Sequence, residues 1–235
     1  MFVKICGITN EDDALLATAL DADALGFVFA PSTRRVDVET VRDIVRRLPR
    51  EMHTIGVFRD ERPERIVEIV GRAGLHGVQL HGDEPASEVR WVRERVQFVI
   101  QAFAAGDPAL TAARRSAADI ILVDSPDPGS GKVFDWRLAE GAPRGKKILL
   151  AGGLTPENVG AAIRLVRPWG VDVSSGVEHA PGRKDPGLLR RFVVAARAAA
   201  AEVDDLAELD AERAIDHTTD EVGGVTRPWD WQIDA

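Results

Sequence analysis

The sequence of 235 residues contains one cysteine, Cys6, and only short hydrophobic runs. A single cysteine excludes a disulfide within the chain and any metal site built from several thiolates. None of the apolar runs approaches the roughly 18 residues that a membrane-spanning helix needs. The chain also enters a predicted strand at once, which leaves no room for a signal peptide. We therefore expect a soluble protein of the cytoplasm with no membrane partner.

An excess of basic residues is missing too. The formal net charge is −8, and the residues from Val203 onward, with ten acids and two arginines, account for all of it. Residues 1–202 are balanced in charge, so they give no electrostatic reason to bind nucleic acid. The acidic residues 203–235 lack a sustained apolar period. We predict that they form a disordered tail behind a single catalytic domain of residues 1–202.

Short apolar stretches alternate with helical patterns along that domain. Continuously apolar strands separated by helices are typical of a parallel sheet that is covered on both faces. Eight such units in about 200 residues predict a (β/α)8 barrel, the TIM barrel. An open doubly wound sheet is the alternative, although the first turn lacks the GxGxxG fingerprint of a dinucleotide site. The predicted strands are 2–6, 24–29, 54–58, 77–80, 97–102, 120–123, 147–150 and 170–173.

Reactive side chains follow several of these strands. The carboxyl ends of barrel strands converge on one mouth, where we expect Cys6, Arg35, His81 and Asp124 to meet. An arginine suits an anion, and a thiol with a carboxylate suits proton transfer between two sides of a sugar. A lone cysteine is also common as a small apolar residue in a core, and His81 could equally be a hydrogen-bonded structural histidine.

The alternation of side chains along a strand places further polar groups. Lys4 shares a face with Cys6, and Gln79 shares a face with His81, because the period of a strand is two. On apolar strands such groups are expected to point into the barrel or its mouth. For Lys4 we favour a buried ion pair with Asp172 of the last strand over a Schiff-base role.

Two turns rich in small residues follow the seventh and eighth strands. The first is Gly152-Gly153, which leads to Thr155 as the expected N-cap of a helix with Pro156 at its first position. The second is Ser174-Ser175-Gly176. Glycine lets backbone N–H groups approach phosphate oxygens, and barrels commonly bind phosphate at these two places. Either turn alone could be a plain tight turn, but together they predict a phosphate site.

With these motifs in place, the chain from Phe2 to about Ala200 resembles the phosphoribosylanthranilate isomerase family of tryptophan biosynthesis. The resemblance implies an Amadori rearrangement in which Asp124 is the general acid and Cys6 the general base. It implies no metal, no organic cofactor and a phosphosugar as the small-molecule partner. Family members occur alone or as dimers, so a monomer and a homodimer both stay open. The motifs are KICGIT, GFVFAPSTRR, VQLHGDE, ILVDS, GSGKVFDW, LAGGLTPENV and VDVSSGVE.

Substrate binding is assigned to the polar and small residues of the mouth. The resemblance gives Arg35 the anthranilate end of the substrate, while Arg34 is expected to point away from the mouth. The phosphate is assigned to the two turns. The predicted substrate-binding residues are Arg35, Gln79, His81, Gly152, Gly153, Asp172, Ser174, Ser175 and Gly176.

Other functions compete with this interpretation. The analogous histidine-pathway isomerase would show an aspartate where this chain has Cys6, and a half-barrel repeat that we do not see. A Schiff-base aldolase would need Lys4 closer to its strand end. A non-catalytic phosphosugar-binding barrel would need the two turns but not Cys6 and Asp124. Whether those two side chains face the same cavity therefore separates an enzyme from a binding protein.

Overall fold

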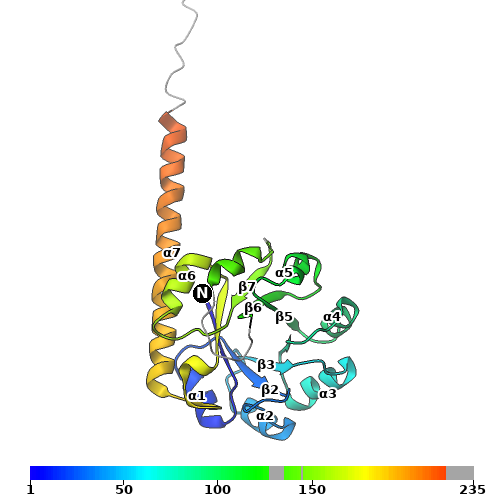
Figure 1. Ribbon diagram of the computed structural model, residues 1–235. Helices are drawn as coiled ribbons and strands as arrows, with labels where there is room; N and C mark the ends of the chain where they lie inside the picture. The colour runs from blue at the N-terminus through cyan, green and yellow to red at the C-terminus, as the bar shows by residue number, and fades with distance from the viewer. Residues whose placement is uncertain (127–134, 144, 221–235) are drawn as a thin grey trace, which may run out of the picture. The chain divides into compact units, whose positions relative to one another are not determined.

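The computed structural model describes residues 1–126, 135–143 and 145–220. Its eight parallel strands close into a barrel in the order β1 to β8, and the helices lie outside the ring (Figure 1). Closure is direct, since β1 pairs with β2 on one side and with β8 on the other. This confirms the (β/α)8 barrel and excludes the open sheet. The strands are β1 (Phe2–Cys6), β2 (Ala24–Val28), β3 (His53–Phe58), β4 (Gly77–Leu80), β5 (Phe98–Ala104), β6 (Ile120–Asp124), β7 (Lys147–Leu150) and β8 (Gly170–Val173).

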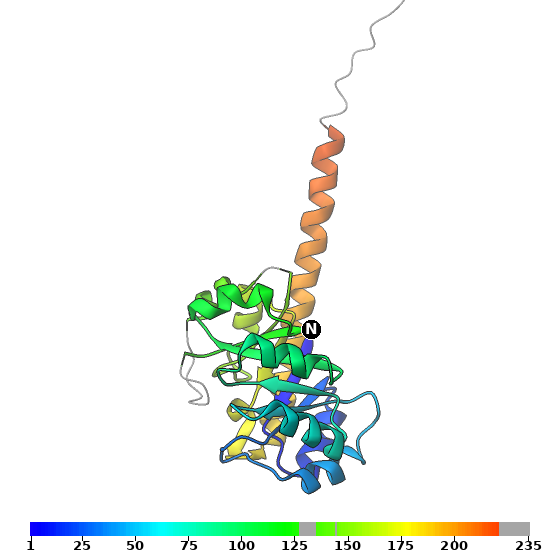
Figure 2. The same cartoon turned by 90° about the vertical axis from the view of Figure 1, so that its right-hand side faces the viewer.

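Helices cover the outer face of the strands, as Figure 2 shows for α3 and α4. In α2 and α3, apolar residues at helical spacing form the buried side, Val38, Val41 and Ile44 in α2 and Ile66, Ile69 and Ala73 in α3. A two-stranded hairpin, β9 (Glu178–Ala180) and β10 (Arg183–Lys184), follows β8. The helices are α1 (Glu11–Ala19), α2 (Val38–Val45), α3 (Pro63–Ala73), α4 (Ala86–Arg93), α5 (Pro108–Ala112), α6 (Val159–Val166) and α7 (Pro186–Asp220), with 3₁₀ turns η1 (Ala113–Arg115), η2 (Trp136–Gly141) and η3 (Ser175–Val177).

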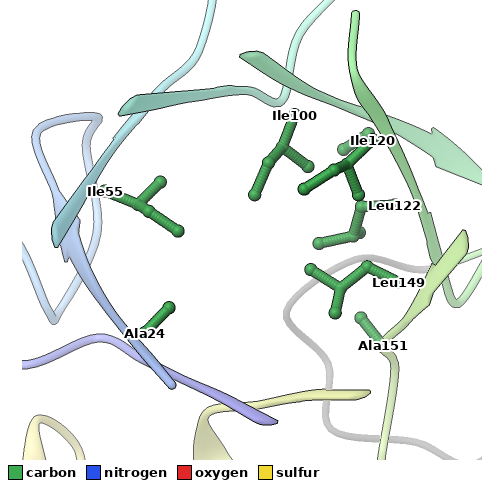
Figure 3. Close-up of a cluster of buried hydrophobic side chains, with 8 residues drawn as sticks. Ala24, Ile55, Ile100, Ile120, Leu122, Leu149 and Ala151 are labelled. Carbon is green, nitrogen blue, oxygen red and sulfur yellow. The ribbon is translucent and has the colours of Figure 1, made fainter. Parts of the chain in front are cut away.

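Aliphatic side chains fill the inside of the barrel, pointing from the strands toward its axis (Figure 3). At the amino ends of the strands, Phe2, Phe98 and Trp169 pack against this cluster, and Phe2 stacks on Trp169 with ring centroids 4.4 Å apart. That end is closed by aromatic rings, so a polar cavity has room only at the carboxyl ends. The cluster consists of Ala24, Ile55, Ile100, Ala102, Ile120, Leu122, Leu149 and Ala151.

Two helix starts differ from the sequence prediction, which is a capping box from Thr9 for the first helix and an N-cap at Thr155 for a later one. The cap of α1 is Asn10, whose side chain accepts the N–H of Asp13 at 2.9 Å. Thr9 instead donates its hydroxyl to the carbonyl of Gly182. The next helix after the Gly152-Gly153 turn, α6, begins at Val159 rather than directly behind Thr155. The Thr155 hydroxyl still accepts the backbone N–H of Glu157 at 3.3 Å, but residues 156–158 form a turn before α6 begins.

The end of the chain also differs from the prediction. The chain divides into two units, residues 1–200 and 201–235, whereas we expected the boundary after Glu202. Helix α7 continues through residues 203–220, where the sequence predicted a tail without regular structure. Eight of its 18 residues are alanine, leucine, glutamate or arginine, and these strong helix formers help to extend a helix that has already begun. Trp229 and Trp231 lie outside the described residues.

The described residues contain no helix that combines the length and the apolar character of a membrane span. They also contain no cluster of three or more histidine, cysteine, aspartate or glutamate side chains arranged to hold a metal ion.

Candidate active site

One cavity of about 460 Å³ opens at the carboxyl ends of the strands. It lies where the barrel geometry places the mouth, opposite the aromatic end. Cys6 from β1 and Asp124 from β6 both line it, so the discriminating condition for an enzyme is met. Every predicted site residue except Arg35 contributes to its lining: Cys6, Gln79, His81, Asp124, Gly152, Gly153, Asp172, Ser174, Ser175 and Gly176.

Cys6 is buried at the end of β1, with 8% of its surface exposed. Burial raises the pKa of its thiol, and the neighbouring Lys4 ammonium opposes that rise. The net pKa lies above the ordinary value, so the resting residue is mainly a thiol. Its base form therefore depends on the cations around it.

Lys4 and Asp172 form the buried ion pair that the sequence predicted, with Nζ and Oδ1 2.9 Å apart. Lys4 is fully buried. Burial by itself would lower the pKa of this ammonium, but Asp172 and Cys6 together raise it above its ordinary value. A Schiff base needs a neutral amine, so the charged Lys4 does not suit that role.

Asp124 lies across the cavity at the end of β6. Its Oδ1 accepts the backbone N–H of Ser125 at 2.7 Å, and its Oδ2 lies 3.4 Å from Nε2 of His81. Nδ1 of His81 is 3.0 Å from the amide Nε2 of Gln79. The three side chains thus form a row from β4 to β6, joined by a hydrogen bond between Gln79 and His81 and by the ion-pair contact of His81 with Asp124. Gln79 and His81 share a face of β4, as the strand period predicted.

A second buried lysine, Lys184, was missed by the sequence analysis. Its ammonium donates to the carbonyls of Cys6 at 2.6 Å and Ser174 at 3.1 Å, and to Glu178 at 2.8 Å. It therefore ties the end of β1 to the turn after β8. Lys184 belongs to β10, a strand of two residues that is too short to show a periodic pattern in the sequence. Of its partners, Glu178 alone was marked by the sequence analysis, as the last residue of the VDVSSGVE motif.

The orientations of Arg34 and Arg35 are the reverse of those expected. Arg34 lines the cavity, and its Nε and Nη2 donate to the two carboxylate oxygens of Glu178 at 2.9 and 2.7 Å. Arg35 is exposed and lines a separate surface hollow with Glu39 and Glu61. The expectation that Arg34 points away is wrong, because its guanidinium group pairs with the carboxylate of Glu178 across the mouth. Arg35 in this structure does not reach the cavity.

The two small-residue turns lie against each other. A Cβ on Gly176 would come 1.9 Å from the carbonyl oxygen of Leu154, so only glycine allows this approach. Gly152 and Gly153 have φ values of 87° and 64°, in the region that favours glycine. The turns thus form one side of the cavity, as a shared phosphate site requires. Residues 129–134 of the GSGKVFDW motif lie outside the described residues.

A family model described as N-(5'-phosphoribosyl)anthranilate (PRA) isomerase matches residues 3–195 of the chain. The chain belongs to this family. The resemblance found in the sequence motifs is confirmed. A PRA isomerase of Desulforudis audaxviator is 48% identical over 204 residues, which cover 84% of this chain and 98% of the relative.

Solved PRA isomerase structures share the fold. The crystal structure from Thermus thermophilus aligns with a TM-score of 0.80 and 40% identity, covering 84% of this chain and 99% of the other. A second PRA isomerase structure contains reduced 1-(o-carboxyphenylamino)-1-deoxyribulose 5-phosphate; it aligns with a TM-score of 0.75 and 40% identity over the same shares. The family model and these likenesses all concern the barrel.

Proposed function

We propose that this chain isomerises N-(5-phosphoribosyl)anthranilate to 1-(2-carboxyphenylamino)-1-deoxyribulose 5-phosphate in tryptophan biosynthesis, with Asp124 as general acid and Cys6 as general base. One observation carries the assignment of roles. A thiol on β1 and a carboxyl group on β6 line a single cavity that also contains the two glycine turns. The family membership supplies the reaction class, and the cavity supplies groups for both proton transfers.

The chemistry needs one proton delivered and one removed. Asp124 protonates the ring oxygen of the ribose, the bond from that oxygen to C1 breaks, and the nitrogen lone pair forms the C1–N double bond. Cys6 as thiolate then removes the proton from C2, which gives the enolamine. The enolamine tautomerises to the ketone, and the sugar loses and gains protons in equal number. Groups positioned for such transfers typically contribute about 10²- to 10⁴-fold each.

The protonation of the acid is tied to the row of Gln79, His81 and Asp124. With the Gln79 amide nitrogen donating to Nδ1, the Nε2 proton of His81 points at Asp124, which is then the carboxylate. Reversing the amide of Gln79 reverses the row, and Asp124 would then donate its proton to Nε2. The other polar atom of this amide, Oε1, is buried without a hydrogen-bond partner among the described residues, so each orientation of the amide leaves one of its two polar atoms unpaired. The row can therefore hold either proton arrangement.

The phosphate is assigned to the adjoining turns of Gly152-Gly153 and Ser174 to Gly176. At Gly176 the two turns come so close that a Cβ would meet the carbonyl oxygen of Leu154. Backbone N–H groups there can donate to phosphate oxygens. The start of α6 lies farther along the chain than expected, so the turn itself rather than a helix end carries this site.

For the carboxylate of the substrate we retain Arg35, on the resemblance of the GFVFAPSTRR motif. Nε and Nη2 of Arg34 already donate to Glu178, so the guanidinium group of Arg34 is partly occupied, and we assign the second carboxylate to the other arginine of the loop. This assignment requires the Arg35 side chain to turn from its surface hollow to the mouth when substrate binds. Its bidentate geometry suits a carboxylate better than a lysine would.

The test is to incubate the purified chain with phosphoribosylanthranilate and follow the loss of anthranilate fluorescence. Rapid loss that disappears in Cys6→Ala and Asp124→Asn supports the proposal. Binding without any loss of fluorescence would instead favour the non-catalytic phosphosugar-binding barrel. We propose the cytoplasm as the location, in keeping with a soluble phosphosugar substrate. Monomer or homodimer stays a prediction.

A further inference from the structure

We propose that Lys4 is a positioning residue for the isomerisation, whose ammonium group faces the sulfur of Cys6 and stabilises its proton-accepting thiolate form. This inference rests on the proposed role of Cys6 as the base. Lys4 and Cys6 share the inner face of β1, and both are buried. A Cβ built on Gly26 of the neighbouring strand would lie 2.9 Å from Sγ of Cys6 and 3.1 Å from Nζ of Lys4. The two atoms therefore converge on the space that Gly26 leaves open.

A count of hydrogen-bond donors separates Lys4 from the other buried lysine. An ammonium group has three N–H donors. Lys184 directs its ammonium to three oxygen atoms, those of Cys6, Ser174 and Glu178. Within the described part of the chain, Nζ of Lys4 has one oxygen partner, Oδ1 of Asp172 at 2.9 Å. Lys4 thus has donors left for a sulfur that lies beside it, and Lys184 does not.

The charged groups around the thiol come from several elements. Asp172 on β8 and Lys184 on β10 act on Cys6 besides Lys4. Arg34, from the loop after β2, is paired with Glu178, which also holds Lys184. Burial raises the pKa of the thiol, Lys4 and Lys184 lower it, and Asp172 raises it. Lys4 and Asp172 therefore act on the same sulfur with opposite signs.

Because Lys4 and Asp172 shift the pKa of the Cys6 thiol in opposite directions, replacing each of them in turn tests the inference. Cys6 is the only cysteine and the sequence has no tyrosine, so the ultraviolet absorbance of a thiolate can be titrated without interference from tyrosinate. In Lys4→Met the pKa of Cys6 should rise, because the positive charge that lowers it is removed. In Asp172→Asn the pKa should fall, because the negative charge that raises it is removed. At a pH below the pKa, each unit by which the thiol pKa rises lowers the thiolate fraction about tenfold. The rate of reaction with a thiol reagent falls with it.

Two further variants keep the result interpretable if a single change leaves an unpaired buried charge and impairs folding. The double variant Lys4→Met/Asp172→Asn removes the whole ion pair, and its thiol pKa should still exceed that of the parent, because Lys4 has the stronger effect. Lys147→Met is the matched control. It removes an exposed lysine from β7 that lies over Trp169 at the amino end of the barrel, and it should leave the titration unchanged.

Shifts of the same sign in Lys4→Met and Asp172→Asn, or an unmoved thiol pKa in both Lys4→Met and the double variant, would overturn the inference. The pH profile of kcat/KM tests the proposed function separately. If the thiolate titration moves in Lys4→Met and the acidic limb of the profile moves with it, both ideas stand. If only the titration moves, Lys4 still controls the thiol, and Cys6 is not the base.

Discussion

At the scale of single residues, the site depends on buried charges that arise far apart in the sequence. The pKa of Cys6 depends on Lys4, two residues away in the sequence, and also on Asp172 and Lys184 near the end of the barrel sequence. Asp124 has a backbone N–H on one oxygen and His81 beside the other. Because an unpaired buried charge is costly, each of these groups restricts which substitutions its neighbours tolerate.

Cys6→Ala and Asp124→Asn should each reduce kcat by about 10³- to 10⁴-fold, since each removes one of the two proton-transfer groups. KM should change little, because binding rests on the arginine loop and the glycine turns. Steady-state kinetics with fluorescence detection measures both constants. Asp119→Asn is the control, as its carboxyl group lies just before β6 and pairs with Arg93. Full activity of Cys6→Ala would make this cysteine a small apolar residue of the core.

The paired arginines give a second prediction. Arg35→Lys should raise KM about tenfold or more through loss of a bidentate carboxylate contact. Arg34→Lys should leave KM close to that of the parent and lower thermal stability, because it replaces the two-point contact with Glu178. Kinetics and thermal denaturation of both variants check this. A raised KM in Arg34→Lys alone would transfer carboxylate binding to Arg34.

At the scale of elements, the turns after β7 and β8 form one wall because backbone meets backbone there. The contact of Gly176 with the carbonyl of Leu154 fixes the distance between the turns. Asn158 holds the first turn in shape by donating its side-chain amide to the carbonyl of Gly153 at 2.9 Å. The geometry of the proposed phosphate site is therefore a property of two turns together and of neither alone.

Gly176→Ala should weaken phosphate binding, since the new Cβ would lie 1.9 Å from the Leu154 oxygen and must push the turns apart. We expect a higher KM and weaker inhibition by inorganic phosphate. The matched control is Gly71→Ala within α3, where a Cβ meets no atom within 4 Å and helix propensity should add about 0.5–1 kcal/mol of stability. Unchanged inhibition by phosphate in Gly176→Ala would remove this turn from the site.

At the scale of the whole molecule, the barrel and the end of the chain behave as separate units. The first part of α7 belongs to the barrel unit, and one side of it is buried as far as Ala200. The buried residues on that side are Leu189, Phe192, Val193, Ala196, Ala199 and Ala200. Residues 201–206 are mostly exposed. Catalysis and stability should therefore be complete without the acidic end of the chain.

Deletion after Glu202 should leave turnover and thermal stability nearly unchanged, because no buried residue of the barrel unit is removed. Deletion after Ala195 is the contrasting variant, since it takes away Ala196, Ala199 and Ala200. The three buried methyl groups alone should cost about 2 kcal/mol. Thermal and denaturant unfolding of both truncations measures the difference. A loss of several kcal/mol on deletion after Glu202 would show that the end of the chain packs on the barrel.

The sequence by itself determined the eight strands and most of the site. Short apolar strands and helical stripes are local patterns, and a closed barrel is the arrangement that buries them all. Once the barrel is known, residues at strand ends must meet at its mouth. Cys6, His81, Asp124 and the two turns could therefore be placed without coordinates, and so could the ion pair of Lys4 with Asp172.

Only the tertiary structure decided what lies outside that periodic pattern. Arg34 and Arg35 are in a loop, where no period of two or of 3.6 indicates which side chain faces the mouth. Arg34 faces it because its side chain pairs with Glu178. Lys184 contacts the Cys6 carbonyl across 178 positions of the chain, a pairing that no local pattern encodes. Helix α7 runs beyond the predicted boundary because propensity continues a helix that packing has begun. Local patterns place side chains on strands, whereas contacts between loops depend on the assembled barrel.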